Sequence, residues 1–273
     1  MSLRRSVEMF DNNVKTEAIP ERILELCKLV VERPIKEGCL KEYMEPEALQ
    51  KTDNVYFPIV RDAAIELRLI QKNGDMIEFC GDKSIVKNLD TFRLYCNSVL
   101  WKDDTVFFFK IAQTILNLNA ELVGENLTSS ESLRRIRDAV SPSINETMLL
   151  GERFWLSFLG FGYVHEGQRI VFLPNMYIAM KDFIAIGNYE KGKEYTIKEF
   201  ILKMNEYAKI AFEGAYESKC LNLATSNALR LLNRKGEIQL SRHSDSKEVW
   251  RLYELETQNI TEITHIKIEE MKK

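Results

Sequence analysis

The 273-residue sequence is poor in cysteine and histidine, and neither residue type is spaced for a metal site or a disulfide framework. The five cysteines are odd in number and form no C-x-x-C pair, and the three histidines form no H-E-x-x-H. Zinc sites and disulfide scaffolds need such spacings. We therefore expect no metal and no cofactor, and cysteines that pack as small hydrophobes. These residues are Cys27, Cys39, Cys80, Cys96, Cys220, His165, His243 and His265.

Long apolar runs are also missing. No run approaches the roughly 18 residues of a membrane-spanning helix. The basic start of the chain is followed by Glu8, Asp11 and Lys15, where a signal peptide would have its apolar core. The sequence therefore predicts a cytoplasmic protein without membrane contact.

Catalytic motifs are absent as well. The sequence has no G-x-x-x-x-G-K-[ST] loop, no G-x-G-x-x-G and no G-x-S-x-G elbow. These motifs create the local geometry for phosphate cradling, dinucleotide binding and hydrolase chemistry. The 41 acidic residues form chance pairs, and none stands out for acid–base chemistry. We therefore expect no catalytic residue and a protein that is not an enzyme.

The composition that is present is globular, with 45% hydrophobic residues, 29% charged residues and a net charge of −3. This composition excludes a disordered or low-complexity chain. Because the chain is slightly acidic, any contact with nucleic acid must come from a local basic patch.

One pattern recurs three times along the chain. A helical apolar spacing is followed by a glycine-containing turn and then by the alternating residues typical of a strand. The pattern predicts three small hairpins, each packed on its own unit, with strands in the ranges Met76–Cys80, Arg169–Leu173 and Glu237–Tyr253.

Short helices are expected before each hairpin. In the first unit Pro20 suits a first helical turn and begins an apolar stripe, and further helices are expected near 36–43 and 55–70. Three helices closed by a hairpin resemble the winged-helix domain, a variant of the helix-turn-helix. We therefore predict a mainly α protein with small β-hairpins, an α+β fold of three tandem winged-helix-like units. The alternative is a single α+β domain with all three hairpins in one sheet.

The predicted organisation has an N-terminal extension at 1–18, units at 19–103, 104–194 and 195–256, and a C-terminal tail at 257–273. Connecting helices at 84–101 and 177–186 close the first two units. The tail spaces its isoleucines in a way that fits either a last strand or an amphipathic helix.

The third unit has the residues that suit DNA. Winged-helix DNA binders place their third helix in the major groove, and here the face opposite the expected core lacks acids. Residues 215–251 hold seven basic and four acidic residues, a local balance of +3. The alternative is an ordinary solvated surface. The predicted nucleic-acid contacts are Asn222, Ser226, Arg230, Arg234, Lys235, Arg242, His243 and Lys247.

The first two units suggest protein contacts instead. Residues 17–82 hold fourteen acids and nine bases, and Asp62 and Glu66 lie one turn apart on the outward face of the third helix. Phosphates would repel that face, which favours a protein partner over nucleic acid, or an idle surface. In the second unit, Trp155 and Phe161 could anchor an interface, although packing within the same chain is the favoured interpretation.

These patterns lead to a hypothesis of function. The leading prediction is a non-enzymatic adaptor or regulator of a prokaryotic multisubunit system that contacts duplex DNA mainly through the third unit and protein partners through the first two. The tandem, motif-free architecture is similar to accessory proteins of prokaryotic defence or DNA-modification clusters. The alternative is a scaffold subunit without nucleic-acid contact, and a third class is an enzyme whose site follows no known motif.

Overall fold

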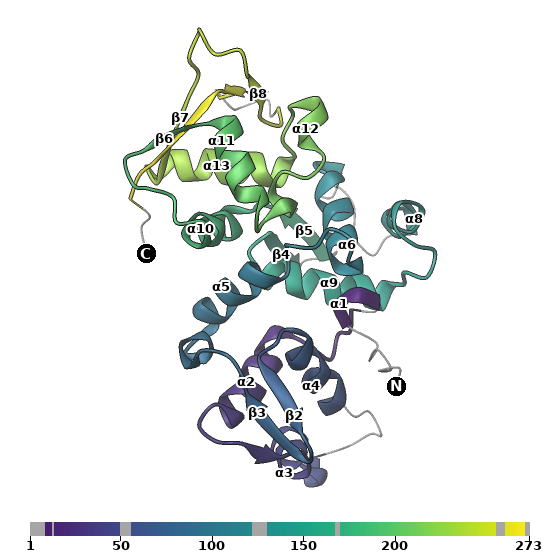
Figure 1. Cartoon of the computed structure of the whole chain (residues 1–273). Coiled ribbons are helices and arrows are strands. Elements are labelled where there is room, and N and C mark those ends of the chain that lie inside the picture. The colour runs from purple at the N-terminus through teal and green to yellow at the C-terminus, as the bar shows by residue number, and fades with distance from the viewer. Residues whose placement is uncertain are drawn as a thin grey trace, which may run out of the picture.

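The protein is mostly helical and carries only small sheets (Figure 1). The computed structural model describes residues 9–12, 14–49, 56–121, 130–166, 170–254 and 260–270. In these residues the strands form four separate antiparallel sheets of two or three strands each. The predicted mainly α fold with small hairpins is therefore confirmed, and the alternative with one common sheet is wrong.

The N-terminal module, residues 20–79, follows the order helix, strand, helix, helix, strand, strand. Pro20 begins the first helix, where its missing N–H costs nothing, and Ile23, Leu24 and Cys27 line the buried face. The three strands form a sheet in the order β1-β3-β2. The elements are α2 (Pro20–Val30), β1 (Ile35–Lys36), α3 (Glu37–Met44), η1 (Glu47–Leu49), α4 (Phe57–Glu66), β2 (Ile70–Asn73) and β3 (Met76–Phe79).

Helix α4 ends earlier than the sequence predicts. The helix was expected to continue to Ile70, but Arg68 adopts a left-handed backbone with φ of 59° and the helix stops at Glu66. Ile70 instead begins the first strand of the hairpin. The apolar spacing of the sequence continues smoothly across this point, so periodicity alone does not reveal the break.

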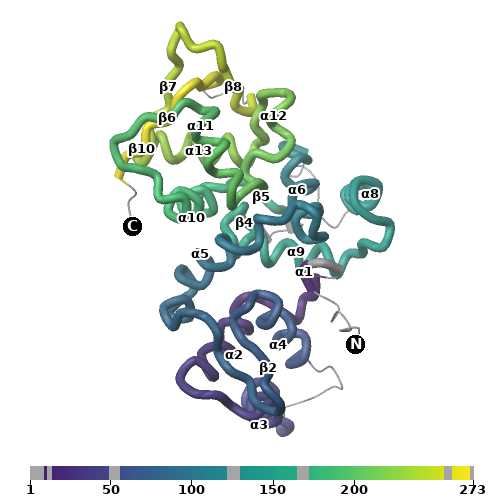
Figure 2. Tube along the Cα trace, viewed as in Figure 1, coloured from purple at the N-terminus to yellow at the C-terminus, as the bar shows by residue number. Residues whose placement is uncertain are grey.

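A middle region links the N-terminal module to the rest of the chain (Figure 2). Its last helix, α9, is buried on most of its surface, as its nearly all-round apolar sequence predicts. The elements of this region are α1 (Met9–Asn12), η2 (Lys83–Val86), α5 (Leu89–Val99), α6 (Phe107–Asn117), α8 (Ser130–Ala139), α9 (Glu146–Phe158), β4 (Gly162–Glu166) and β5 (Ile170–Pro174).

The C-terminal module, residues 177–268, repeats the order of the principal elements of the N-terminal module and adds a short helix and two short strands. Its three-stranded sheet has the order β6-β10-β7, so that the last strand is again central. The elements are α10 (Tyr177–Ile186), β6 (Glu194–Thr196), α11 (Ile197–Asn205), η3 (Lys209–Ala211), α12 (Ala215–Ser218), α13 (Leu223–Arg234), β7 (Ile238–Ser241), β8 (Trp250–Arg251), β9 (Glu262–Ile263) and β10 (His265–Ile268).

One expectation about this module is wrong. The partner of β7 is β10, with Leu240 opposite Ile266, whereas β8 pairs with β9 to form a separate two-stranded sheet. The C-terminal segment supplies the central strand, which confirms the last-strand alternative for this segment, because its alternating isoleucines fill the core side of the sheet. The helix α10, expected to connect the second and third units, packs against α13 and also against α5 of the middle region.

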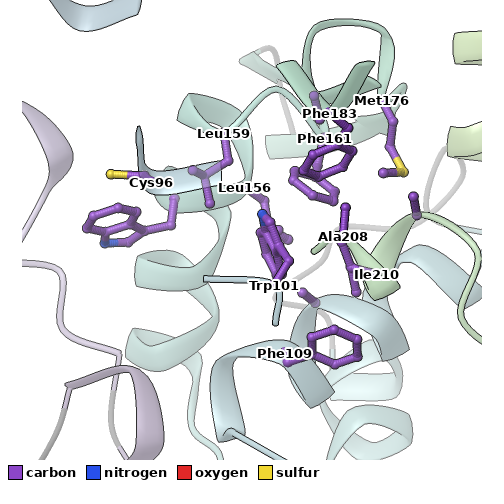
Figure 3. Close-up of a cluster of buried hydrophobic side chains, with 14 of the residues drawn as sticks. Cys96, Trp101, Phe109, Leu156, Leu159, Phe161, Met176, Phe183, Ala208 and Ile210 are labelled. Atoms are coloured by element: carbon purple, nitrogen blue, oxygen red, sulfur yellow. The ribbon is translucent and has the colours of Figure 1, made fainter. Parts of the chain in front are cut away.

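A shared aromatic core joins the middle region to the C-terminal module (Figure 3). Phe161 lies 4.7 Å from Trp101 and 6.0 Å from Phe183, measured between ring centroids. These rings come from three segments that are distant in sequence, and all are fully buried. The middle region and the C-terminal module therefore form one packed body, to which the N-terminal module is attached.

Candidate functional site

In the C-terminal module, the face of α13 that was expected to read DNA is buried. Ser226 is fully buried, and its Oγ accepts a hydrogen bond from the backbone N–H of Tyr253 at 2.8 Å. Arg230 is 7% exposed, and its Nε and Nη2 both donate to the carbonyl oxygen of Ile260. Asn222 caps the helix, because its Oδ1 accepts from the N–H of Thr225 at 2.9 Å. The prediction that Ser226 and Arg230 face a major groove is therefore wrong.

The cover over this face comes from the inserted segment, defined here as the residues 242–264 between β7 and β10. Backbone hydrogen bonds join Arg251 to Lys219 and Leu221, just before α13. Trp250 is buried and its ring meets that of Tyr216 at 5.6 Å. The sequence shows which residues share a face of α13, but it does not show that a later segment folds back onto that face.

The cations expected beside this helix are exposed, but several have partners within the chain. Arg242 pairs with Glu262 at 2.7 Å. Lys235 donates to the hydroxyl of Tyr177 at 3.1 Å and lies over its ring. Because Glu262 belongs to the segment that was expected to lie outside the unit, the local balance of +3 overstates the positive charge of this surface.

The remaining predicted contacts do not form one patch. His243 stacks on His265 at 4.0 Å and lies 3.5 Å from a carboxylate oxygen of Glu194. Arg234 and Lys247 are exposed and make no ion pair with any described residue. Arg234 ends α13, whereas Lys247 lies in the inserted segment.

In the N-terminal module, the two predicted partner-binding acids already have partners. Asp62 accepts hydrogen bonds from the guanidinium of Arg61 at 2.6 and 2.8 Å. Glu66 accepts from the backbone N–H groups of Met9 and Phe10 at 2.7 and 2.9 Å, so that it holds α1 against α4. Glu66 therefore acts at a contact within the chain, while Asp62 is half-exposed.

Both acids line an opening next to this helix. This joint cleft has a volume of about 620 Å³ and lies between α4 and the connection from α5 to α6. Ile65, Val99 and Val106 give it an apolar lining, and Ile65 is 37% exposed. The full lining is Phe10, Asp62, Ile65, Glu66, Leu67, Arg68, Val99, Leu100, Lys102, Asp103 and Val106.

The two aromatic residues proposed as interface anchors are internal. Trp155 is fully buried, and its Nε1 donates to the carbonyl oxygen of Ala18 at 3.0 Å. Phe161 belongs to the shared aromatic core. The interface interpretation is therefore wrong for both, and packing within the same chain is confirmed.

A buried polar network between α5 and α10 was not predicted. Asp182 accepts from Arg93 and from Asn97, each at 2.8 Å, and Asn97 in turn accepts from the indole N–H of Trp101. Burial raises the pKa of the Asp182 carboxyl, while Arg93 acts in the opposite direction. The partners lie up to 89 residues apart, so no local sequence signal joins them. Arg93 and Asp182 border a second cavity of about 420 Å³.

Within the described residues, no group of three or more His, Cys, Asp or Glu side chains is placed to hold a metal ion. No helix in those parts is long and apolar enough to cross a membrane. Comparison with known protein families, with curated proteins and with solved structures gives no significant match to this chain.

Proposed function

We propose that the chain is a non-enzymatic adaptor that binds protein partners and does not read DNA sequence. The observation that carries this proposal is the burial of α13, whose Ser226 and Arg230 hydrogen-bond to the inserted segment. A base edge can be read only by side chains that reach into a groove. The apolar lining of the joint cleft, by contrast, is open to a partner.

The element order supports a relationship to winged helices. Apart from the added helix α12 and the strands β8 and β9 of the C-terminal module, both modules run helix, strand, helix, helix, strand, strand, and both place the last strand at the centre of the three-stranded sheet. We infer that each is a winged-helix-like module used for protein contact. The setting that we propose is a cytoplasmic prokaryotic multisubunit assembly, in line with the resemblance of the sequence to accessory proteins of such systems.

The test is binding of a labelled DNA duplex by the full chain, from about 50 mM to about 200 mM salt. We expect no saturable binding at the higher salt and no preference among duplex sequences. Any weak binding at low salt should fall in the same proportion for all duplexes, since only phosphates are contacted.

Matched variants make the result specific. Arg230→Leu removes the buried guanidinium, and Lys247→Gln removes an exposed cation of the inserted segment. Neither should alter discrimination between duplexes. Tight, sequence-selective binding that Arg230→Leu abolishes in a folded protein would restore the DNA-reading hypothesis and overturn the adaptor proposal.

A further inference from the structure

Two cations stand at the joint cleft with no acidic partner. Arg68 follows α4, and Lys102 follows α5, so the two approach the cleft from different elements. Both are exposed, and neither lies within ion-pair distance of an acid among the residues that the structure describes. The cleft therefore has free cationic hydrogen-bond donors on two of its walls.

The acids of the same cleft have much of their acceptor capacity in use. Asp62 and Glu66 are bound by Arg61 and by the backbone of α1. Asp103 accepts from the N–H and hydroxyl of Thr105 at 2.9 and 2.6 Å, and these hydrogen bonds lower the pKa of its carboxyl. These hydrogen bonds favour the ionised form of Asp103, which has no ion-pair partner among the described residues. The unpaired charged groups of the cleft are therefore this carboxylate and the cations of Arg68 and Lys102, beside apolar surface.

The backbone at Arg68 gives a second, independent observation. Its φ of 59° lies in the left-handed region, which glycine or asparagine adopts far more readily at the end of a helix. An arginine there is strained, and its exposed guanidinium makes no hydrogen bond or ion pair with a described residue. Strain of this kind is found most often where a residue serves binding.

We propose that the joint cleft binds an acidic segment of a partner protein that also carries apolar side chains. Carboxylates of the segment would pair with Arg68 and Lys102, and its apolar side chains would cover Ile65, Val99 and Val106. The cleft volume accommodates several side chains. This inference rests on the proposed adaptor function and names the chemistry of the partner.

The test is selection from a random displayed peptide library on the full chain, with counter-selection on the Arg68→Gly/Lys102→Gln double variant. We expect the retained peptides to be enriched in Asp and Glu beside Leu, Ile, Phe or Trp. Failure to retain any peptide, or enrichment without acids, overturns the inference. A rise in melting temperature with inorganic phosphate or ATP, without peptide enrichment, assigns the cleft to a small anion and overturns it as well.

Single variants separate binding from a merely structural role. Arg68→Gly relieves the left-handed strain, so it should raise the melting temperature by about 2–4 °C while weakening the selected peptides about tenfold. Lys198→Gln, on the exposed side of α11, is the matched control and should change neither quantity. Unchanged peptide affinity in Arg68→Gly contradicts the inference. The duplex experiment does not depend on this cleft, so failure here leaves the adaptor proposal standing.

Discussion

The N-terminal and C-terminal modules share an order of principal elements and differ most in the connection between their last two sheet strands. In the N-terminal module, Gly74 and Asp75 alone join the last two strands, and Gly74 has the positive φ of 65° that such a turn requires. In the C-terminal module, the inserted segment 242–264 joins the corresponding strands. The same topology thus supports a minimal turn in one case and a folded insertion in the other.

This difference in the connection decides whether α4 or α13 is accessible to a partner. Trp250, Leu252 and Ile263 of the inserted segment are buried, so these parts of the insertion belong to the core. It closes α13, whereas Ile65 of α4 stays partly open beside the joint cleft. Equal element order therefore does not give equal function, and the exposed surface must be considered for each module.

The largest expected effect tests whether the inserted segment is needed for the stability of the C-terminal module. Trp250→Ala removes a buried indole that packs against Tyr216 of α12, and we expect the free energy of unfolding to fall by about 3–5 kcal/mol. The measurement is urea denaturation. Asn73→Ala, at the exposed end of the N-terminal hairpin, is the control and should shift stability by less than about 0.5 kcal/mol. A loss below about 1 kcal/mol in Trp250→Ala would show that the insertion is not part of the core.

The attachment of the N-terminal module depends on Glu66. Glu66→Ala leaves the N–H groups of Met9 and Phe10 without their carboxylate, and we expect a loss of about 1.5–3 kcal/mol. Asp62→Ala on the same helix face should cost less than about 1 kcal/mol, because its ion pair is half-exposed. Equal losses in the two variants, measured by urea denaturation, would contradict the role assigned to Glu66.

Helix α9 adds a pH dependence that belongs to neither module. Glu152 is fully buried, and burial raises the pKa of its carboxyl well above the ordinary value. As the pH rises, Glu152 loses its proton in the unfolded chain at a lower pH than in the folded protein. The contribution of the protonated Glu152 carboxyl to the free energy of unfolding is therefore complete below about pH 4.5, and it is lost as the pH rises towards the folded-state pKa.

Glu152→Gln should remove this dependence. Relative to the variant, the wild-type protein should lose about 1 kcal/mol of stability per pH unit within that interval. The measurement is a series of denaturation curves at increasing pH. Parallel stability profiles for the two proteins would show that Glu152 is ionised in the folded state.

The smallest effect is expected at the minimal turn. A Cβ at Gly74 meets no atom within 4 Å, so Gly74→Ala tests the backbone conformation alone. We expect a loss of about 1 kcal/mol from the left-handed strain, seen as a lower melting temperature. Gly38→Ala, equally open and without a positive φ, is the control and should not lose stability. No loss in Gly74→Ala would show that the turn tolerates side chains.

Local patterns in the sequence predict where helices and strands lie better than they predict which elements pair or pack together. The proline at α2 and the apolar spacing of α10 locate both helices, because these signals act within a few residues. The pairing of β7 with β10 was missed because the partner strand follows an insertion. The end of α4 was missed because an arginine occupies a position that usually signals itself by glycine.

The candidate site shows the same limit. The acidic charge of the first unit predicted Asp62 as a partner-binding residue, and Asp62 does line the joint cleft. Phe10 and Lys102 complete the cleft from segments far away in sequence, and no spacing rule connects them to α4. Ser226 and Arg230 were assigned to the surface because helical periodicity identifies faces without identifying what covers them.

The most direct test of the account compares the accessibility of the two third helices. In a Cys39→Ser/Cys80→Ser/Cys220→Ser background, single cysteines are introduced by Ile65→Cys on α4 and by Ser226→Cys on α13. The rate of modification by a polar thiol reagent is then measured under native conditions. The account predicts rapid labelling at position 65 and strong protection at position 226, because modification there requires the inserted segment to open. Equal rates at the two positions would show that α13 is open in solution and would contradict the central claim.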